Sequence, residues 1–99
     1  MDHRYLNLLG IAYRAGKCIT GEEAIIKSIQ HKKANVVLIA EDIGESTKKK
    51  ITDKCKTYNI PCIIVDNREI LSQAIGQIGR VAIAIEDKGF SKKMLSYFT

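Results

Sequence analysis

Around Gly21, the residue types and their spacing favour contact with a negatively charged ligand. Gly21 stands where a helix is expected to begin, Glu22 and Glu23 follow in its first turn, and Lys27 lies four residues after Glu23 on the same face. A helix start offers free backbone N–H groups and a positive potential, which suit phosphates and electron-rich base edges. The alternative is purely structural: the two glutamates compensate the helix dipole, and Glu23 pairs with Lys27.

A second candidate site is the segment of residues 76–80, Gly-Gln-Ile-Gly-Arg. Two conformationally permissive glycines surround one apolar side chain, which predicts a loop in which Gln77, Ile78, Gly79 and Arg80 are candidates for ligand contact. The alternative for Ile78 is that it anchors the loop in the core.

The sequence contains no catalytic or metal-binding pattern. Its glycines match neither a phosphate-binding loop of the G-x-x-x-x-G-K-[ST] type nor a dinucleotide fingerprint. His3 and His31 have no companion at ligand spacing, and the odd set of Cys18, Cys55 and Cys62 forms no C-x-x-C pair. We therefore expect a protein that is not an enzyme and that uses no cofactor, metal ion or disulfide framework.

Composition predicts a single basic domain over residues 1–99. The chain has 16 basic and 11 acidic residues and a formal net charge of +5, which favours a polyanionic partner. Lys17, close to Gly21 in sequence, and His31, on the exposed face of the same helix, are further candidates for that contact. The apolar runs fall far short of the ~20 residues that span a membrane, so a cytoplasmic protein without membrane contact is expected.

The elements that position these residues follow from apolar periodicity. Helical spacing is expected over residues 2–15, 21–33, 46–58, 67–75 and 90–98, and continuous apolar runs predict strands at residues 18–19, 36–40, 62–65 and 81–85. Ser46, either Asp66 or Asn67, and Gly89 are the expected starts of the last three helices. The run at 62–65 is expected to be buried. Helices alternating with strands predict an α/β fold, a three-layer α/β/α sandwich around a small mixed sheet.

Several stretches carry a resemblance to a known family, over roughly residues 14–85. They are the Gly21 to Lys27 spacing, Lys32-Lys33-Ala34, VVLIAED at residues 36–42, Asn59-Ile60-Pro61, and LSQAIGQIGRVAIAI at residues 71–85. On these residues the chain resembles the ribosomal-protein family that binds kink-turn RNA, founded by the archaeal protein L-seven-Ae and the eukaryotic L-thirty-e. Within that family it is most similar to the short YlxQ-like proteins of bacteria.

The resemblance implies that the helix beginning at Gly21 enters the kink and recognises tandem sheared G·A pairs through an Asn-Glu pair and a lysine. In this sequence the Asn position falls on Glu23, the Glu position falls on Ala24, and Lys27 alone is kept. An asparagine both donates and accepts hydrogen bonds, whereas a carboxylate only accepts and an alanine side chain does neither. The family's second contact is a loop on bulged nucleotides, which implies an apolar contact from Ile78 and a phosphate or stacking contact from Arg80.

Two functions follow from this comparison. The first is recognition of a kink-turn or related internal loop in structured RNA, by a monomer that joins a ribosomal or ribonucleoprotein partner. The second is a ribosome-associated scaffold for protein interactions, which keeps the fold and has lost kink-turn specificity. The changes at Glu23 and Ala24 favour the second function, and Lys27 and the net charge favour the first.

Overall fold

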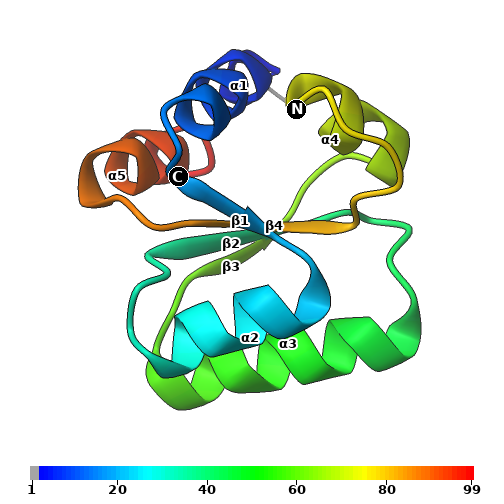
Figure 1. Cartoon of the computed structure of the whole chain (residues 1–99), viewed down its shortest axis with the longest axis vertical. Coiled ribbons are helices and arrows are strands. Elements are labelled where there is room, and N and C mark those ends of the chain that lie inside the picture. The colour runs from blue at the N-terminus through cyan, green and yellow to red at the C-terminus, as the bar shows by residue number, and fades with distance from the viewer. Residues whose placement is uncertain (1–2) are drawn as a thin grey trace.

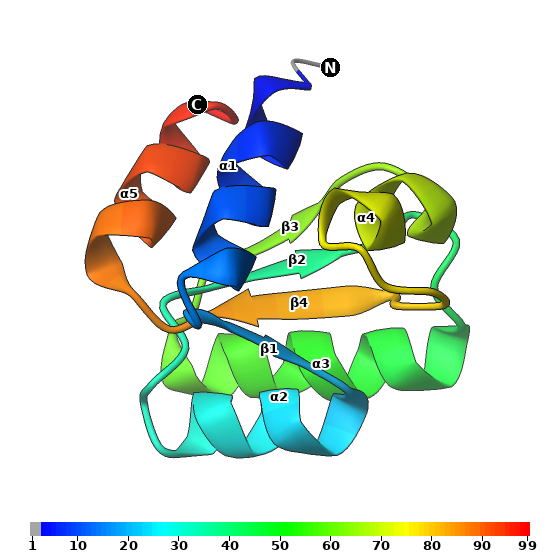
Figure 2. The ribbon, with the colours of Figure 1, turned by 45° about the horizontal axis from the view of Figure 1, so that its top comes forward.

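Helices and strands alternate along residues 3–99, the part of the chain that the computed structural model describes (Figure 1). In chain order the elements are α1 (Arg4–Arg14), β1 (Cys18–Thr20), α2 (Glu22–Gln30), β2 (Val36–Ile39), α3 (Glu45–Tyr58), β3 (Cys62–Ile64), α4 (Arg68–Ala74), β4 (Ala82–Ile85) and α5 (Lys88–Ser96). Helices α1, α4 and α5 cover one face of the sheet, and α2 and α3 lie side by side on the other (Figure 2). The expected three-layer α/β/α sandwich is confirmed.

The sheet has the strand order β1-β4-β2-β3, so the last strand of the chain lies between two earlier ones. β4 runs antiparallel to both neighbours, and β2 and β3 are parallel. The carboxyl ends of β1, β2 and β3 therefore meet the amino end of β4. We call this the loop end, marked by Gly21, Asp42 and residues 76–80; the opposite end, marked by Lys17, Asn35 and Cys62, is the cysteine end.

The central strand β2 separates two apolar cores. Val36 and Leu38 face the layer of α1, α4 and α5, whereas Val37 and Ile39 face α2 and α3, and all four are fully buried. This alternation explains the unbroken apolar run, because a strand covered on both faces needs apolar side chains on both. Within residues 3–99, no helix combines the length and the apolar character needed to cross a membrane.

The prediction that residues 62–65 form a buried strand is wrong for the first part of the run. β3 is an edge strand, and its Ile64 side chain is 49% exposed, while Val65 beyond it is buried.

The C-terminal helix α5 packs on the domain itself. Met94 is buried, and the Phe98 ring meets the Tyr5 ring edge-on, with 5.2 Å between the ring centroids.

Two expected helix starts are also wrong. α3 begins at Glu45 because the Gly44 carbonyl already accepts the Lys48 N–H at 2.9 Å, which places Ser46 inside the first turn. α5 begins at Lys88 because the Asp87 carboxylate accepts the Phe90 N–H at 2.7 Å, a stronger cap than a glycine offers.

The choice between Asp66 and Asn67 is settled by Asn67, whose side chain accepts the Ile70 N–H at 2.9 Å. The expected start of the first helix at Asp2 lies outside the described residues.

Candidate functional site

The turn from β1 into α2 presents unpartnered backbone N–H groups at the loop end. Gly21 is the N-cap of α2 with φ 93° and ψ 135°, a conformation that side-chain-bearing residues rarely adopt, and it supplies no side-chain cap. Its carbonyl accepts the Ile25 N–H at 2.9 Å. Within residues 3–99, the N–H groups of residues 22–24 have no acceptor, so the start of α2 can bind an anionic or electron-rich group.

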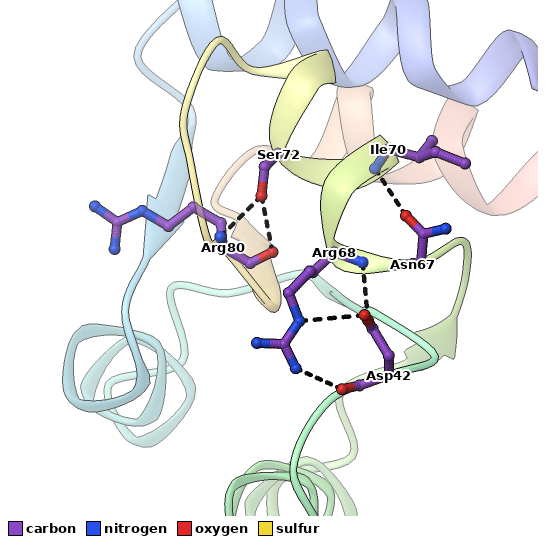
Figure 3. Close-up of polar contacts among 6 residues, drawn as sticks. All are labelled: Asp42, Asn67, Arg68, Ile70, Ser72 and Arg80. Carbon is purple, nitrogen blue, oxygen red and sulfur yellow. Dashed lines mark hydrogen bonds and ion pairs between the residues drawn. The ribbon is translucent and has the colours of Figure 1, made fainter.

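The loop of residues 76–80 is held in place by a serine of the helix before it. Ser72 Oγ accepts the Arg80 N–H at 2.8 Å and donates to the Arg80 carbonyl at 3.1 Å (Figure 3). Gly76 and Gly79 have φ of 68° and 71°, which allow the chain to turn twice within the loop. Ile78 between them is 94% exposed, so the alternative of a buried anchor is wrong.

The two candidate elements, far apart in sequence, line one pocket. A cavity of about 150 Å³ is bordered by Gly21 and Glu22 on one side and by Gly79 and Arg80 on the other, and α3 also lines it. On the far side of the loop, a second cavity of about 420 Å³ is lined by α4 and by Ile78. The exposed loop therefore stands between two concave surfaces, an arrangement that suits a bulged ligand more than a flat one.

Two cations among the predicted site residues have no counter-charge within residues 3–99. In the described part of the chain, the Arg80 guanidinium makes neither a hydrogen bond nor an ion pair, and its Nε is buried without an acceptor. Figure 3 shows this side chain turned away from Arg68. Lys27 is exposed on α2 and has no ion pair among residues 3–99. Glu22, not Glu23, forms an interhelix ion pair, at 3.7 Å from Lys50 Nζ, so the structural alternative of a Glu23–Lys27 pair is not observed.

An ion pair that the sequence did not indicate braces the same end of the sheet. The Arg68 backbone N–H, Nε and Nη2 donate to Asp42 Oδ1, Oδ2 and carbonyl oxygen at 2.8, 3.2 and 2.6 Å (Figure 3). Although desolvation acts in the opposite direction, these hydrogen bonds hold the pKa of the Asp42 carboxyl below its ordinary value. The one sequence signal is an aspartate at a strand exit; its partner lies 26 residues away.

Other predicted site residues lie elsewhere or are already engaged. Lys17 precedes β1 at the cysteine end, where its carbonyl accepts the Glu86 N–H at 2.7 Å. His31 ends α2, about 15 Å along the helix from Gly21. The Gln77 amide donates to the Tyr13 hydroxyl at 2.8 Å and so ties the loop to α1. The structure thus brings together Gly21, Glu22, Gly79 and Arg80, with Glu23 and Lys27 on the adjoining exposed face of α2 and Ile78 at the loop tip.

Comparisons with known proteins all point to one protein family. The model of the ribosomal protein L7Ae/L30e/S12e/Gadd45 family matches residues 4–95. RNA-binding protein YlxQ of Bacillus subtilis (strain 168) is 44% identical over 89 residues, which cover 90% of this chain and 89% of that protein. RNA-binding protein YlxQ of Enterococcus faecium is 46% identical over 88 residues, covering 89% and 84%. A solved structure of a protein with unknown function from Bacillus halodurans C is 43% identical, with a TM-score of 0.92 and 96% of each chain covered.

Proposed function

Because this chain belongs to the ribosomal protein L7Ae/L30e/S12e/Gadd45 family, we propose that it is a non-catalytic RNA-binding protein that recognises a kink-turn or a related structured internal loop. The similar proteins of B. subtilis and E. faecium are both called RNA-binding proteins. The observation that supports the proposal most is the shared pocket, in which the start of α2 meets the 76–80 loop at one end of the sheet.

Each element of the site suits a different part of a folded RNA. The unpartnered N–H groups at the start of α2 are donors for phosphate or base-edge oxygen and nitrogen atoms, and Lys27 adds positive charge on the same helix. Ile78 offers an apolar surface to a base that has left the stack, and the Arg80 guanidinium is free to bind a phosphate or to stack. An RNA that already samples the kinked form would be selected from its ensemble.

The exposed face of α2 also indicates how this chain differs from the Asn-Glu pattern implied by the resemblance. Glu23 and Ala24 are both exposed there. A carboxylate accepts hydrogen bonds only, so Glu23 is suited to a guanine or cytosine amino group, whereas the Ala24 side chain forms no hydrogen bond. We therefore expect recognition to depend on the shape of the internal loop and on Lys27 and Arg80.

The second candidate is the ribosome-associated scaffold for protein interactions that has lost kink-turn specificity. The exposed Ala24 favours the scaffold. Its apolar side chain can form no hydrogen bond to a base, and it does not pack in the core. The scaffold and the RNA-binding function predict opposite outcomes when two RNAs are compared.

A gel-shift or fluorescence titration with matched RNAs tests the proposal. One RNA carries a kink-turn, and the other differs only in that its tandem G·A pairs are replaced by Watson–Crick pairs. We expect about tenfold or greater preference for the kink-turn, which corresponds to ~1.4 kcal/mol. Equal affinity for the two RNAs would reject specific recognition and leave only charge-driven contact, as the scaffold function predicts.

The cellular setting forms part of the proposal. We expect a cytoplasmic protein that is monomeric when free and that joins a ribosomal or other ribonucleoprotein particle. Sedimentation of a cell extract through a sucrose gradient tests this: the protein should travel with large particles, and ribonuclease treatment should return it to the top of the gradient. Slow sedimentation before ribonuclease treatment would contradict the association.

A further inference from the structure

A cavity at the cysteine end, away from the proposed RNA-binding surface, is lined by two thiols. Cys55, in the last turns of α3, and Cys62, the first residue of β3, border a cavity of about 630 Å³. Its other walls include Ile60, Pro61 and Ile64. The proposed function of the loop end makes no use of this cavity.

The two thiols differ in exposure and line the same cavity. Cys55 is buried, at 2% exposure, whereas Cys62 is half-buried and reachable from the cavity. Cys62 packs against the apolar cluster that contains Cys55, and the neighbouring Cys55 thiol lowers the pKa of the Cys62 thiol, whereas the pKa of the Cys55 thiol is raised. The half-buried member of the pair therefore has the greater thiolate character, and the buried member lies beside it.

We propose that Cys55 and Cys62 form a dithiol site at which hydrogen peroxide makes an intramolecular disulfide. The Cys62 thiolate attacks one peroxide oxygen, the O–O bond breaks, hydroxide leaves and takes up a proton, and Cys62 becomes a sulfenic acid. The Cys55 thiol then loses its proton as its sulfur attacks Cys62 Sγ; the S–O bond breaks and water leaves. The two thiols give up two electrons and two protons, and the peroxide is reduced to two waters.

The arrangement matches the chemistry of known redox-sensing thiols. Such cysteines combine a lowered pKa, access to solvent and a neighbouring thiol that resolves the sulfenic acid before it is oxidised further. In reducing compartments, protein disulfides are usually transient ones of this kind. Cys18 provides a contrast within the same chain, because burial raises the pKa of its thiol to about 12 and no second thiol adjoins it among the described residues.

Peptide mapping of the folded wild-type chain tests the proposal without any substitution. The protein is exposed to hydrogen peroxide, remaining thiols are blocked with iodoacetamide, and the monomer fraction is digested with trypsin in the absence of reductant. Trypsin cleaves after Lys54, Lys56 and Arg68, so Cys55 leaves in the dipeptide 55–56 and Cys62 in the peptide 57–68. We expect these two peptides joined by a bond that dithiothreitol cleaves, and Cys18 alkylated in its own peptide.

Three outcomes would overturn the proposal: a disulfide that includes Cys18, a disulfide found only between two chains, or Cys62 oxidised to sulfinic acid with Cys55 still alkylated. A variant pair adds a second measurement. Cys55→Ser should stop the reaction at a Cys62 sulfenic acid that dimedone traps, whereas Cys18→Ala should form the disulfide at the wild-type rate. Circular dichroism confirms that each variant is folded, and equal disulfide yield from Cys55→Ser and wild type would also reject the assignment.

Discussion

Backbone hydrogen bonds close the sheet at both ends, but the loop end also presents donors that have no acceptor among residues 3–99. At the cysteine end the Lys17 carbonyl accepts the Glu86 N–H at 2.7 Å, and at the loop end the Val81 carbonyl accepts the Ala40 N–H at 2.8 Å. At the loop end, the first N–H groups of α2 and the Arg80 guanidinium have no acceptor within residues 3–99. The Arg80 Nε is buried, and a buried donor is costly when it is unpaired, which supports the loop end as the place where a ligand binds.

The sharpest test of this comparison removes one lysine from α2, the helix that begins at the loop end, and one lysine beside the cysteine-end cavity. Lys27→Ala should weaken binding to a kink-turn RNA about tenfold to a hundredfold, in keeping with ~1–3 kcal/mol for a lost base contact. Lys56→Ala is the matched control, since Lys56 is also an exposed helical lysine but borders the cysteine-end cavity. Titration by fluorescence anisotropy measures both. Equal losses in the two variants would show that only net charge matters.

The backbone at the loop end is tested by comparing two glycine N-caps. Gly21 has φ 93°, so Gly21→Ser should lower the free energy of unfolding by about 1–3 kcal/mol, although a Cβ would meet nothing within 4 Å. Gly44 has an ordinary extended conformation, with φ −65° and ψ 146°, and there a serine is a favourable cap. Urea denaturation should therefore show Gly44→Ser to be as stable as wild type or slightly more stable. Similar losses at both positions would contradict a conformational cause.

The layers of the fold could be predicted from the sequence, whereas the order of the strands in the sheet could not. Periodicity separates helix from strand because each buries a face with its own period, and β2 is apolar throughout because both of its faces are covered. An apolar run does not say which strand lies at an edge, so β3 was expected to be buried although Ile64 is half exposed. The insertion of β4 between β1 and β2 depends on packing of distant segments.

The same limit applies to the site. Gly21 and Arg80 were predicted separately from local patterns, but their meeting in one pocket follows from strand order. Lys17 and Gly21 are close in sequence, yet β1 lies between them and places them at opposite ends of the sheet. The bond from Arg68 to Asp42 joins residues 26 positions apart, for which a single sequence carries no signal.

Substitution of Ile78 should lower RNA affinity and leave the stability of the fold unchanged. The side chain is 94% exposed, so Ile78→Ser should change the free energy of unfolding by less than about 0.5 kcal/mol. If a bulged base packs on it, RNA affinity should fall by about fivefold, close to 1 kcal/mol of lost apolar contact. Paired urea and RNA titrations on the same preparation give both values. Unchanged affinity would remove the loop tip from the interface.

Two arginines at the loop end allow a smaller and more specific test. The Arg80 guanidinium has no counter-charge in the described residues, whereas that of Arg68 is held by Asp42. If Arg80 neutralises one phosphate, Arg80→Gln should lower the slope of log affinity against log salt by about one unit. Arg68→Gln should change the slope less. A larger change for Arg68 than for Arg80 would reverse the assignment.

The smallest expected effect is on stability in acid, and it comes from the Asp42 carboxyl, which binds Arg68 at the loop end. Its pKa is held below the ordinary 3.8 in the folded protein, so its stabilising contribution is complete above that value and is lost as pH falls through the lower, folded pKa. Asp42→Asn removes the titration, and its melting temperature should fall less steeply than that of wild type in acid below about pH 4. Because the pair is exposed, the difference should shrink further in high salt, where surface ion pairs are screened. Parallel acid profiles of the two proteins would mean that Arg68 holds the loop through the Asp42 carbonyl alone, and the brace would then be independent of pH.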